Sequence, residues 1–171
     1  VMTTLLTLEN AQLSDQVTMT ATGVSGVTDG GASISAQLDE VFTLEQCLYA
    51  IMLASANDVA LQIAEQIGGS VDGFVQMMNN RAVELGCTNT VFTNPTGLPD
   101  DNQHTTAHDM ALIMQAAIQN ESFRTIAAAT SYTIPATNKA AARNLTSKFT
   151  MTDTGSTGFY EGCIGGKEGY T

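Results

Sequence analysis

The stretch Leu53-Ala54-Ser55-Ala56-Asn57-Asp58 separates two strongly apolar helical patterns. Apolar residues recur every three or four positions over 44–53 and again over 59–67. This spacing predicts two consecutive helices, the first apolar on more than one side and therefore central. Ser55 and Asn57 then place two neutral hydrogen-bonding side chains at a fixed point of a rigid scaffold. The competing interpretation is local, because S-x-N is common and Ser55 could simply cap the second helix.

On the N-terminal side, the sequence predicts a helix over 1–11, a short strand over 16–20 and a loop over 22–35. The pair Gly30-Gly31 marks a turn in that loop. Thr43 and Gln46 form a capping box that opens the central helix. No capping residue precedes the first helix, so we expect the chain to begin inside it.

On the C-terminal side, Ser70 opens a helix that Gly86 ends, and Thr106 with Asp109 opens another. An irregular segment over 87–103 lies between them. A short helix over 122–128 and a strand over 131–134 are expected next, then a polar segment over 138–158 and a strand within 160–171. The pattern predicts one helix-rich α+β domain with few strands and four or five helices.

The composition bounds the possible functions. Hydrophobic residues make up 43% of the 171 residues, which is enough for a core. The net charge is −11 with only six Lys and Arg residues, so nucleic acid is excluded as a partner. Three cysteines without a C-x-x-C pair predict neither a disulfide framework nor a zinc site. No signal peptide or transmembrane run is visible.

Lys167-Glu168-Gly169 near the end of the chain is a second candidate motif. A lysine on a glycine-flanked strand can be an ordinary edge residue that prevents aggregation. The functional interpretation is a cation at the rim of a cleft, where the glycines let a substrate backbone approach closely.

The two motifs together are more specific than either alone. Serine acyl transferases that bind penicillin carry S-x-x-K, S-x-N and K-T-G in this order. The chain resembles one group of them, the serine-type D-alanyl-D-alanine carboxypeptidases or low-molecular-mass penicillin-binding proteins. The resemblance runs along nearly the whole chain and is carried by residues 1–3, 53–60, 85–98, 104–111 and 162–171.

The resemblance implies the helix-rich part of a β-lactamase/transpeptidase-like domain in an extracytoplasmic bacterial enzyme. Such an enzyme removes the terminal D-alanine from peptidoglycan stem peptides through an acyl-serine, and β-lactams acylate the same serine. Ser55 would relay a proton, Asn57 would orient the substrate amide, Lys167 would be an electrostatic anchor and Gly169 would allow close approach. No metal or organic cofactor is implied, and any membrane attachment would come from segments outside this chain.

Two departures from the family pattern limit this expectation. No lysine of the chain has a serine three positions before it, so S-x-x-K is missing. The resemblance places that motif's lysine immediately before Val1. We therefore expect the nucleophile and its base outside this chain, and residues 1–171 as a single partial catalytic domain truncated at both ends. Glu168 replaces the usual threonine at a substrate-binding position, where a carboxylate would repel the substrate carboxylate.

Two alternatives stay open. The chain could belong to a non-catalytic relative that binds cell-wall peptide or a protein partner, as Glu168 and the missing S-x-x-K would suggest. A serine β-lactamase of the same fold ranks lower, because the loop segments match the carboxypeptidase pattern.

Overall fold

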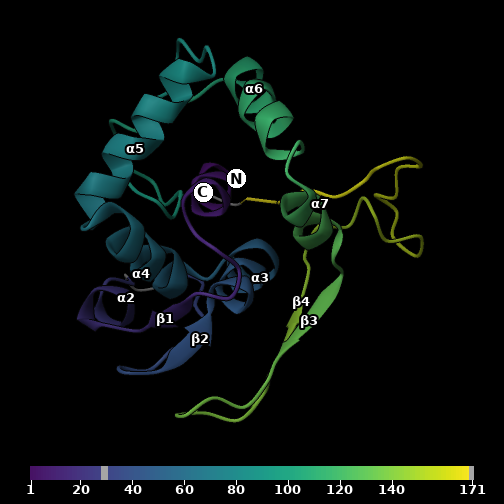
Figure 1. The fold of residues 1–171 in the computed structure, drawn as a ribbon. Coiled ribbons are helices and arrows are strands. Elements are labelled where there is room, and N and C mark those ends of the chain that lie inside the picture. The colour runs from purple at the N-terminus through teal and green to yellow at the C-terminus, as the bar shows by residue number, and fades with distance from the viewer. Residues whose placement is uncertain (28–30, 170–171) are drawn as a thin grey trace.

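A computed structural model describes residues 1–27 and 31–169 (Figure 1). Within these ranges it contains seven helices and four short strands. The helices are α1 (Met2–Asn10), α2 (Ala21–Ser25), α3 (Leu44–Ala54), α4 (Asn57–Gly68), α5 (Val71–Glu84), α6 (Ala107–Ala117) and α7 (Glu121–Ala128), and the strands are β1 (Gln16–Thr18), β2 (Val41–Thr43), β3 (Ser131–Ile134) and β4 (Arg143–Thr146).

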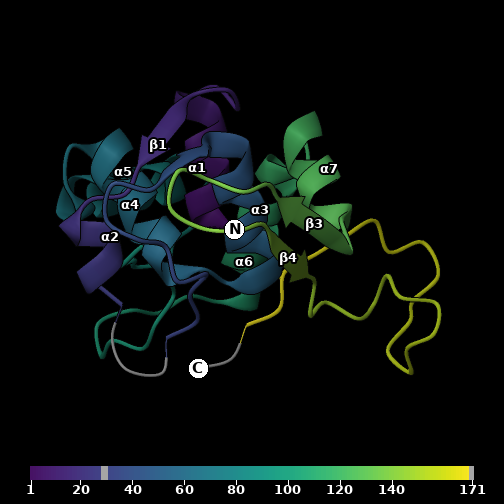
Figure 2. The ribbon, with the colours of Figure 1, turned by 90° about the horizontal axis from the view of Figure 1, so that it is seen from below.

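Two helices occupy the centre of the molecule. Helix α3 is buried over most of its length, as its apolar pattern predicts. Helix α1 shares that position, because it packs against α3, α4, α5, α6 and α7. In Figure 1 the helices from α4 to α7 form an arc around α1, and Figure 2 shows α1 and α3 side by side from another direction. Three of the buried residues of α1 are the threonines Thr3, Thr4 and Thr7. Because threonine is polar, the hydropathy pattern of α1 does not show that the helix is buried.

The strands form two separate antiparallel pairs. Strand β1 pairs with β2, with Val17 opposite Phe42, and β2 runs directly into α3. Strand β3 pairs with β4 in a hairpin with Tyr132 opposite Leu145. The predicted helix-rich α+β architecture with few strands is therefore confirmed.

The predicted helix starts are confirmed by their capping hydrogen bonds. Gln46 donates its backbone N–H to Thr43 Oγ1 at 3.3 Å, and its own Oε1 accepts from Thr43 N at 2.9 Å. Ser70 and Thr106 cap α5 and α6 in the same manner. These bonds satisfy backbone donors that have no partner within the helix.

Several local predictions were wrong. The segment predicted as a loop contains α2, whose first turn Thr20 caps, while residues 28–30 and thus Gly30 lie outside the described residues. Strand β4 lies in the segment that was predicted only as polar, because pairing with β3 decides its conformation. Seven helices exceed the four or five expected. None of the described helices is long and apolar enough to cross a bilayer.

The predicted C-terminal strand is also wrong over residues 160–169, which have no strand assignment, and residues 170–171 lie outside the described residues. A strand needs a neighbour for its backbone groups. Among the described residues, residues 160–169 bond to another element through a backbone hydrogen bond from Gly166 N to Ala127 O of α7, at 3.2 Å.

Candidate active site

Ser55 occupies a strained backbone position at the junction of α3 and α4. Its φ of 55° and ψ of 38° lie in the left-handed region, which is uncommon for a residue other than glycine. Both Ser55 and Ala56 donate their backbone N–H to Ala50 O, which fixes the turn. Ala56 is the N-cap of α4, and among the described residues no side chain caps that helix. The interpretation of Ser55 as the cap of the second helix is therefore wrong, and Ser55 is instead the C-cap of α3.

The hydroxyl of Ser55 instead meets the second motif. Lys167 Nζ donates a hydrogen bond to Ser55 Oγ at 2.6 Å, across 112 positions of the sequence. The same Nζ also donates to the backbone oxygen of Glu168. The structure thus brings together two of the residues that the sequence singled out separately.

The segment before Lys167 lies close to the C-terminal end of α7. Gly165 has a φ of 141°, and a Cβ there would lie 2.6 Å from the backbone oxygen of Ala127. A side chain at Gly165 would therefore push the segment away from α7. Gly165 therefore determines how closely the segment that carries Lys167 can approach the junction of α3 and α4.

The electrostatics of Lys167 reflect its half-buried position. Burial lowers the pKa of Lys167 below its ordinary value of 10.5. The carboxylate of Glu168 opposes this change, and the charge of Lys148 adds to it. The ammonium is thus partly stripped of water, which strengthens its attraction for an anionic group.

Asn57 is the first residue of α4 and is 7% exposed. Its backbone N–H donates to Ala32 O at 2.9 Å. Among the described residues, no hydrogen bond uses its side-chain amide. The amide is therefore held at the junction while its own donor and acceptor remain available.

Asp58 is a structural residue that the sequence did not distinguish from an ordinary helix-starting acid. It is 2% exposed and accepts from Ser33 Oγ at 2.6 Å, from Ala36 N at 3.1 Å and from Ile34 N at 3.4 Å. These bonds bind residues 33–36 to the start of α4. Since Asn57 N also bonds to Ala32 O, residues 32–36 are held against the start of α4.

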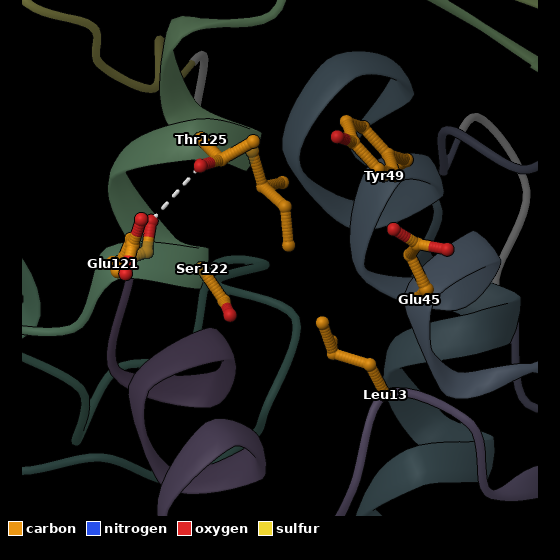
Figure 3. A pocket seen from close by; sticks show the side chains of 7 residues that line it. Leu13, Glu45, Tyr49, Glu121, Ser122 and Thr125 are labelled. Carbon is orange, nitrogen blue, oxygen red and sulfur yellow. Dashed lines mark hydrogen bonds between the residues drawn. The ribbon is translucent and has the colours of Figure 1, made fainter.

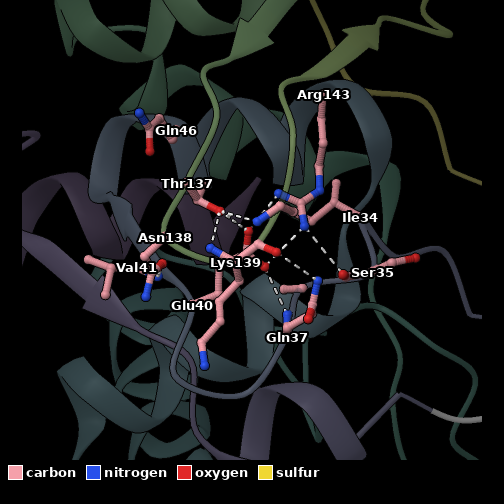
Figure 4. A network of polar contacts seen from close by, with 12 residues as sticks. Ile34, Ser35, Gln37, Glu40, Val41, Gln46, Thr137, Asn138, Lys139 and Arg143 are labelled. Carbon is pink, nitrogen blue, oxygen red and sulfur yellow. Dashed lines mark hydrogen bonds and ion pairs between the residues drawn. The ribbon is translucent and has the colours of Figure 1, made fainter.

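A buried ion pair anchors the other end of that segment (Figure 4). Glu40 is fully buried and accepts from Arg143 at 2.8 and 3.0 Å. Burial alone would raise the pKa of Glu40, but hydrogen bonds from Arg143, from Thr137 and from the backbone of Gln37 together lower it. The pair ties residues 35–41 to the hairpin of β3 and β4. No periodicity in the sequence marked either partner.

The start of α1 borders a cavity. Val1, Met2 and Thr3 line this cavity, which has a volume of about 390 Å³, together with Phe92 and residues 94–97 and 103–105. Thr3 Oγ1 donates to Pro95 O at 2.6 Å and fixes that segment to α1. Three segments distant in sequence thus converge on one region.

Residues 1–171 match the model of the peptidase S11 family, described as D-alanyl-D-alanine carboxypeptidase. The chain belongs to this family. Both partners of the hydrogen bond between Lys167 and Ser55 lie within the matched residues.

Relatives of this S11 chain include D-alanyl-D-alanine carboxypeptidase DacF of Bacillus subtilis, 37% identical over 71% of the chain and 32% of DacF. DacB2 of Mycobacterium tuberculosis is 33% identical over 92% of the chain and 53% of DacB2. The crystal structure of the Streptomyces K15 DD-transpeptidase superposes with a TM-score of 0.89 at 26% identity, covering 99% of this chain and 68% of that one. The chain therefore spans about a third to a half of the length of these curated relatives.

The remaining two predicted site residues, Glu168 and Gly169, lie at the protein surface. Glu168 and Gly169 are both exposed, and apart from the chain neighbours of Gly169, no atom of the described residues lies within 4 Å of the position that a Cβ on Gly169 would take. Among the described residues, no ion pair involves the Glu168 carboxylate. Glu168 affects Lys167 through its charge and through its backbone oxygen.

Proposed function

We propose that the protein carrying this chain removes the terminal D-alanine from D-alanyl-D-alanine peptides through an acyl-serine intermediate. The single observation that carries the proposal is the hydrogen bond between Lys167 Nζ and Ser55 Oγ. Membership of the peptidase S11 family supports it independently.

We assign the nucleophilic serine and its lysine base to an S-x-x-K motif that ends immediately before Val1. The order of the motifs supports this assignment, because S-x-x-K precedes S-x-N in the penicillin-binding serine acyl transferases. One helical turn separates the first and last residues of S-x-x-K, so its serine and lysine would face each other.

Three side chains of this chain then have distinct roles in the proposal. The serine oxygen attacks the carbonyl carbon of the penultimate D-alanine, and the carbon–nitrogen bond to the last residue breaks. Ser55 relays a proton to the departing nitrogen, and Lys167 holds the substrate carboxylate by charge-assisted hydrogen bonding. Asn57 orients the substrate amide, and Gly169 leaves room for its backbone. Water then hydrolyses the acyl-serine.

The substrate class and location follow from the same proposal. D-alanyl-D-alanine ends occur in peptidoglycan stem peptides, so the enzyme would act on the outer side of the cytoplasmic membrane of a bacterium, secreted or attached to that face. β-Lactams would acylate the same serine. Any membrane anchor would come from segments outside residues 1–171.

The test begins with the residues encoded immediately before Val1. If they include S-x-x-K, the protein produced with them should release D-alanine from a D-alanyl-D-alanine peptide, measured with a coupled assay. The matched control replaces the motif's serine with alanine. The absence of release from the unmodified protein would contradict the proposal.

A second candidate is a non-catalytic relative that binds cell-wall peptide or a protein partner. Glu168 favours it, because an exposed carboxylate stands where the family pattern has threonine. Calorimetry with a D-alanyl-D-alanine peptide separates the two. Saturable binding without D-alanine release would support the binding protein, whereas release would support the enzyme.

A further inference from the structure

Two segments that are distant in sequence bond to the same short stretch, residues 127–130, which contains the end of α7 and the link to β3. Gly166 N donates to Ala127 O at 3.2 Å, and Ser147 N donates to Thr130 O at 2.8 Å. The residue that follows each of these two donors is a lysine. The fold therefore brings the backbones of two lysines to one place.

Phe149 holds the two segments against each other. Its half-buried ring lies on the backbone of Gly166, where a Cβ would overlap the ring. Phe149 N donates to Ser147 Oγ at 3.2 Å, and this bond closes a turn around Lys148. Lys148 is thus fixed between two anchored residues, beside the segment that carries Lys167.

The two ammonium groups interact with each other and lack an acidic partner. Burial lowers the pKa of Lys167, and the charge of Lys148 lowers it further. Among the described residues, no carboxylate oxygen lies within 4 Å of either ammonium group. This is unusual in a chain with 17 acidic and only six basic residues. Two cations that repel each other bind an anion favourably, because the anion offsets the repulsion.

A pocket elsewhere in the molecule has the opposite charge. It has a volume of about 200 Å³, opens between the first turns of α3 and α7, and is lined by Glu45 and Glu121 (Figure 3). Each carboxylate lies in the first turn of its helix, where the helix dipole favours it. This pocket would repel a carboxylate ligand, whereas the two lysines would attract one.

We propose that Lys148 is a second binding residue for the terminal carboxylate of the peptide substrate. The proposal rests on the function proposed above, in which Lys167 holds that carboxylate beside Ser55. A carboxylate has two oxygens, so one can accept from Lys167 while the other faces Lys148. Lys148 is exposed, so its contribution is modest. Its effect is to favour a peptide with a free terminal carboxylate over one that ends in an amide.

The first measurement is equilibrium binding, which requires no turnover. The ¹⁵N-labelled protein that includes the residues before Val1, with any S-x-x-K serine replaced by alanine, is titrated with acetyl-D-alanyl-D-alanine and with its C-terminal amide. Amide chemical shifts give the Kd of each peptide. We expect Lys148→Gln to raise the Kd of the free carboxylate about two- to fivefold and to leave that of the amide unchanged. Lys148→Arg keeps the charge and should restore most of the affinity.

Lys139→Gln is the matched control. It makes the same change in net charge and lies on the same hairpin, in the exposed turn between β3 and β4. It should leave both Kd values unchanged. The difference between the Lys148→Gln and Lys139→Gln variants should shrink as the salt concentration rises, because salt screens exposed charges.

Three results would overturn the proposal. Equal weakening by Lys148→Gln and Lys139→Gln would mean diffuse attraction by net charge. Equal weakening of the carboxylate and the amide by Lys148→Gln would mean that Lys148 only supports the fold. Absence of saturable binding of the free carboxylate would mean that the two lysines hold no substrate.

Turnover separates this proposal from the proposed function. The absence of D-alanine release by the unmodified protein would contradict the acyl transfer, while a selective loss of carboxylate affinity in Lys148→Gln would still support the binding role. Where D-alanine is released, Lys148→Gln should raise KM by the same factor as Kd and leave kcat unchanged. A fall in kcat with an unchanged KM would contradict a binding role for Lys148.

Discussion

Lys167 and Ser55 are 112 positions apart in the sequence and are joined by a hydrogen bond of 2.6 Å between Nζ and Oγ. Each partner is fixed by its own surroundings. Ser55 is held in a left-handed turn after α3, and the backbone before Lys167 passes close to the end of α7 at Gly165. Strained positions of this kind persist where the surrounding structure imposes them, and they cluster at functional sites.

Replacing Ser55 with alanine should abolish most activity without unfolding the protein. The hydroxyl has Lys167 as its partner among the described residues, so its loss removes one half-buried contact. A proton relay contributes about 10²- to 10⁴-fold to a rate. We expect a fall of that size in D-alanine release by the protein that includes the residues before Val1. Ser14→Ala, at an exposed position, is the control. Unchanged D-alanine release by the Ser55→Ala variant would contradict the proposed role of Ser55 as a proton relay.

Replacing Glu168 with threonine should improve substrate binding. The Glu168 side chain is exposed, and its charge opposes the attraction of Lys167 for a substrate carboxylate. Exposed charge pairs have small effects, so KM should fall about two- to fivefold, and less at high salt. The control is Glu161→Thr, an exposed carboxylate six positions from Lys167. No difference between the two variants would place Glu168 out of reach of the substrate.

The 171-residue chain alone should form no covalent adduct with penicillin. The proposed nucleophile lies before Val1, and Ser55 Oγ already accepts a hydrogen bond from Lys167 Nζ. A fluorescent penicillin followed by denaturing electrophoresis checks this directly. The longer protein with S-x-x-K should be labelled. Labelling of residues 1–171 would instead place the nucleophile inside this chain.

Local signals predicted the helices well. The capping box at Thr43 and Gln46, the cap at Ser70 and the cap at Thr106 depend only on residues three positions apart. Sequence reasoning can see such pairs, because helix starts are local structures. The order of Ser55-x-Asn57 and Lys167 also predicted a shared site, although the hydrogen bond itself required the fold.

Features that depend on distant partners were missed. Strand β4 exists because it pairs with β3, and Asp58 matters because residues 33–36 fold back over the start of α4. Glu40 gave no sign of its pairing with Arg143, which lies 103 positions away. The prediction of a C-terminal strand was wrong for the same reason. Residues 160–169 have a composition typical of strands, but no strand lies beside them among the described residues.

The Glu40–Arg143 pair should control stability. Arg143→Met would leave a buried carboxylate without its cation and should lower the free energy of unfolding by about 3–5 kcal/mol at pH 7. The double variant with Glu40→Gln should recover part of this loss, because the uncompensated charge is gone. Arg124→Met is the control, since Arg124 is exposed and should cost less than about 1 kcal/mol.

The same pair predicts how stability depends on pH. The native pKa of Glu40 lies below its ordinary value of 4.5, so the unfolded chain binds a proton first as the pH falls. The contribution of Glu40 is therefore complete above pH 4.5 and is lost as the pH drops through the native pKa. Urea unfolding between pH 7 and pH 3 should show a loss that Glu40→Gln lacks. Parallel pH profiles for the two proteins would mean that Glu40 has an ordinary pKa, and the network in Figure 4 would not be stabilising its charge.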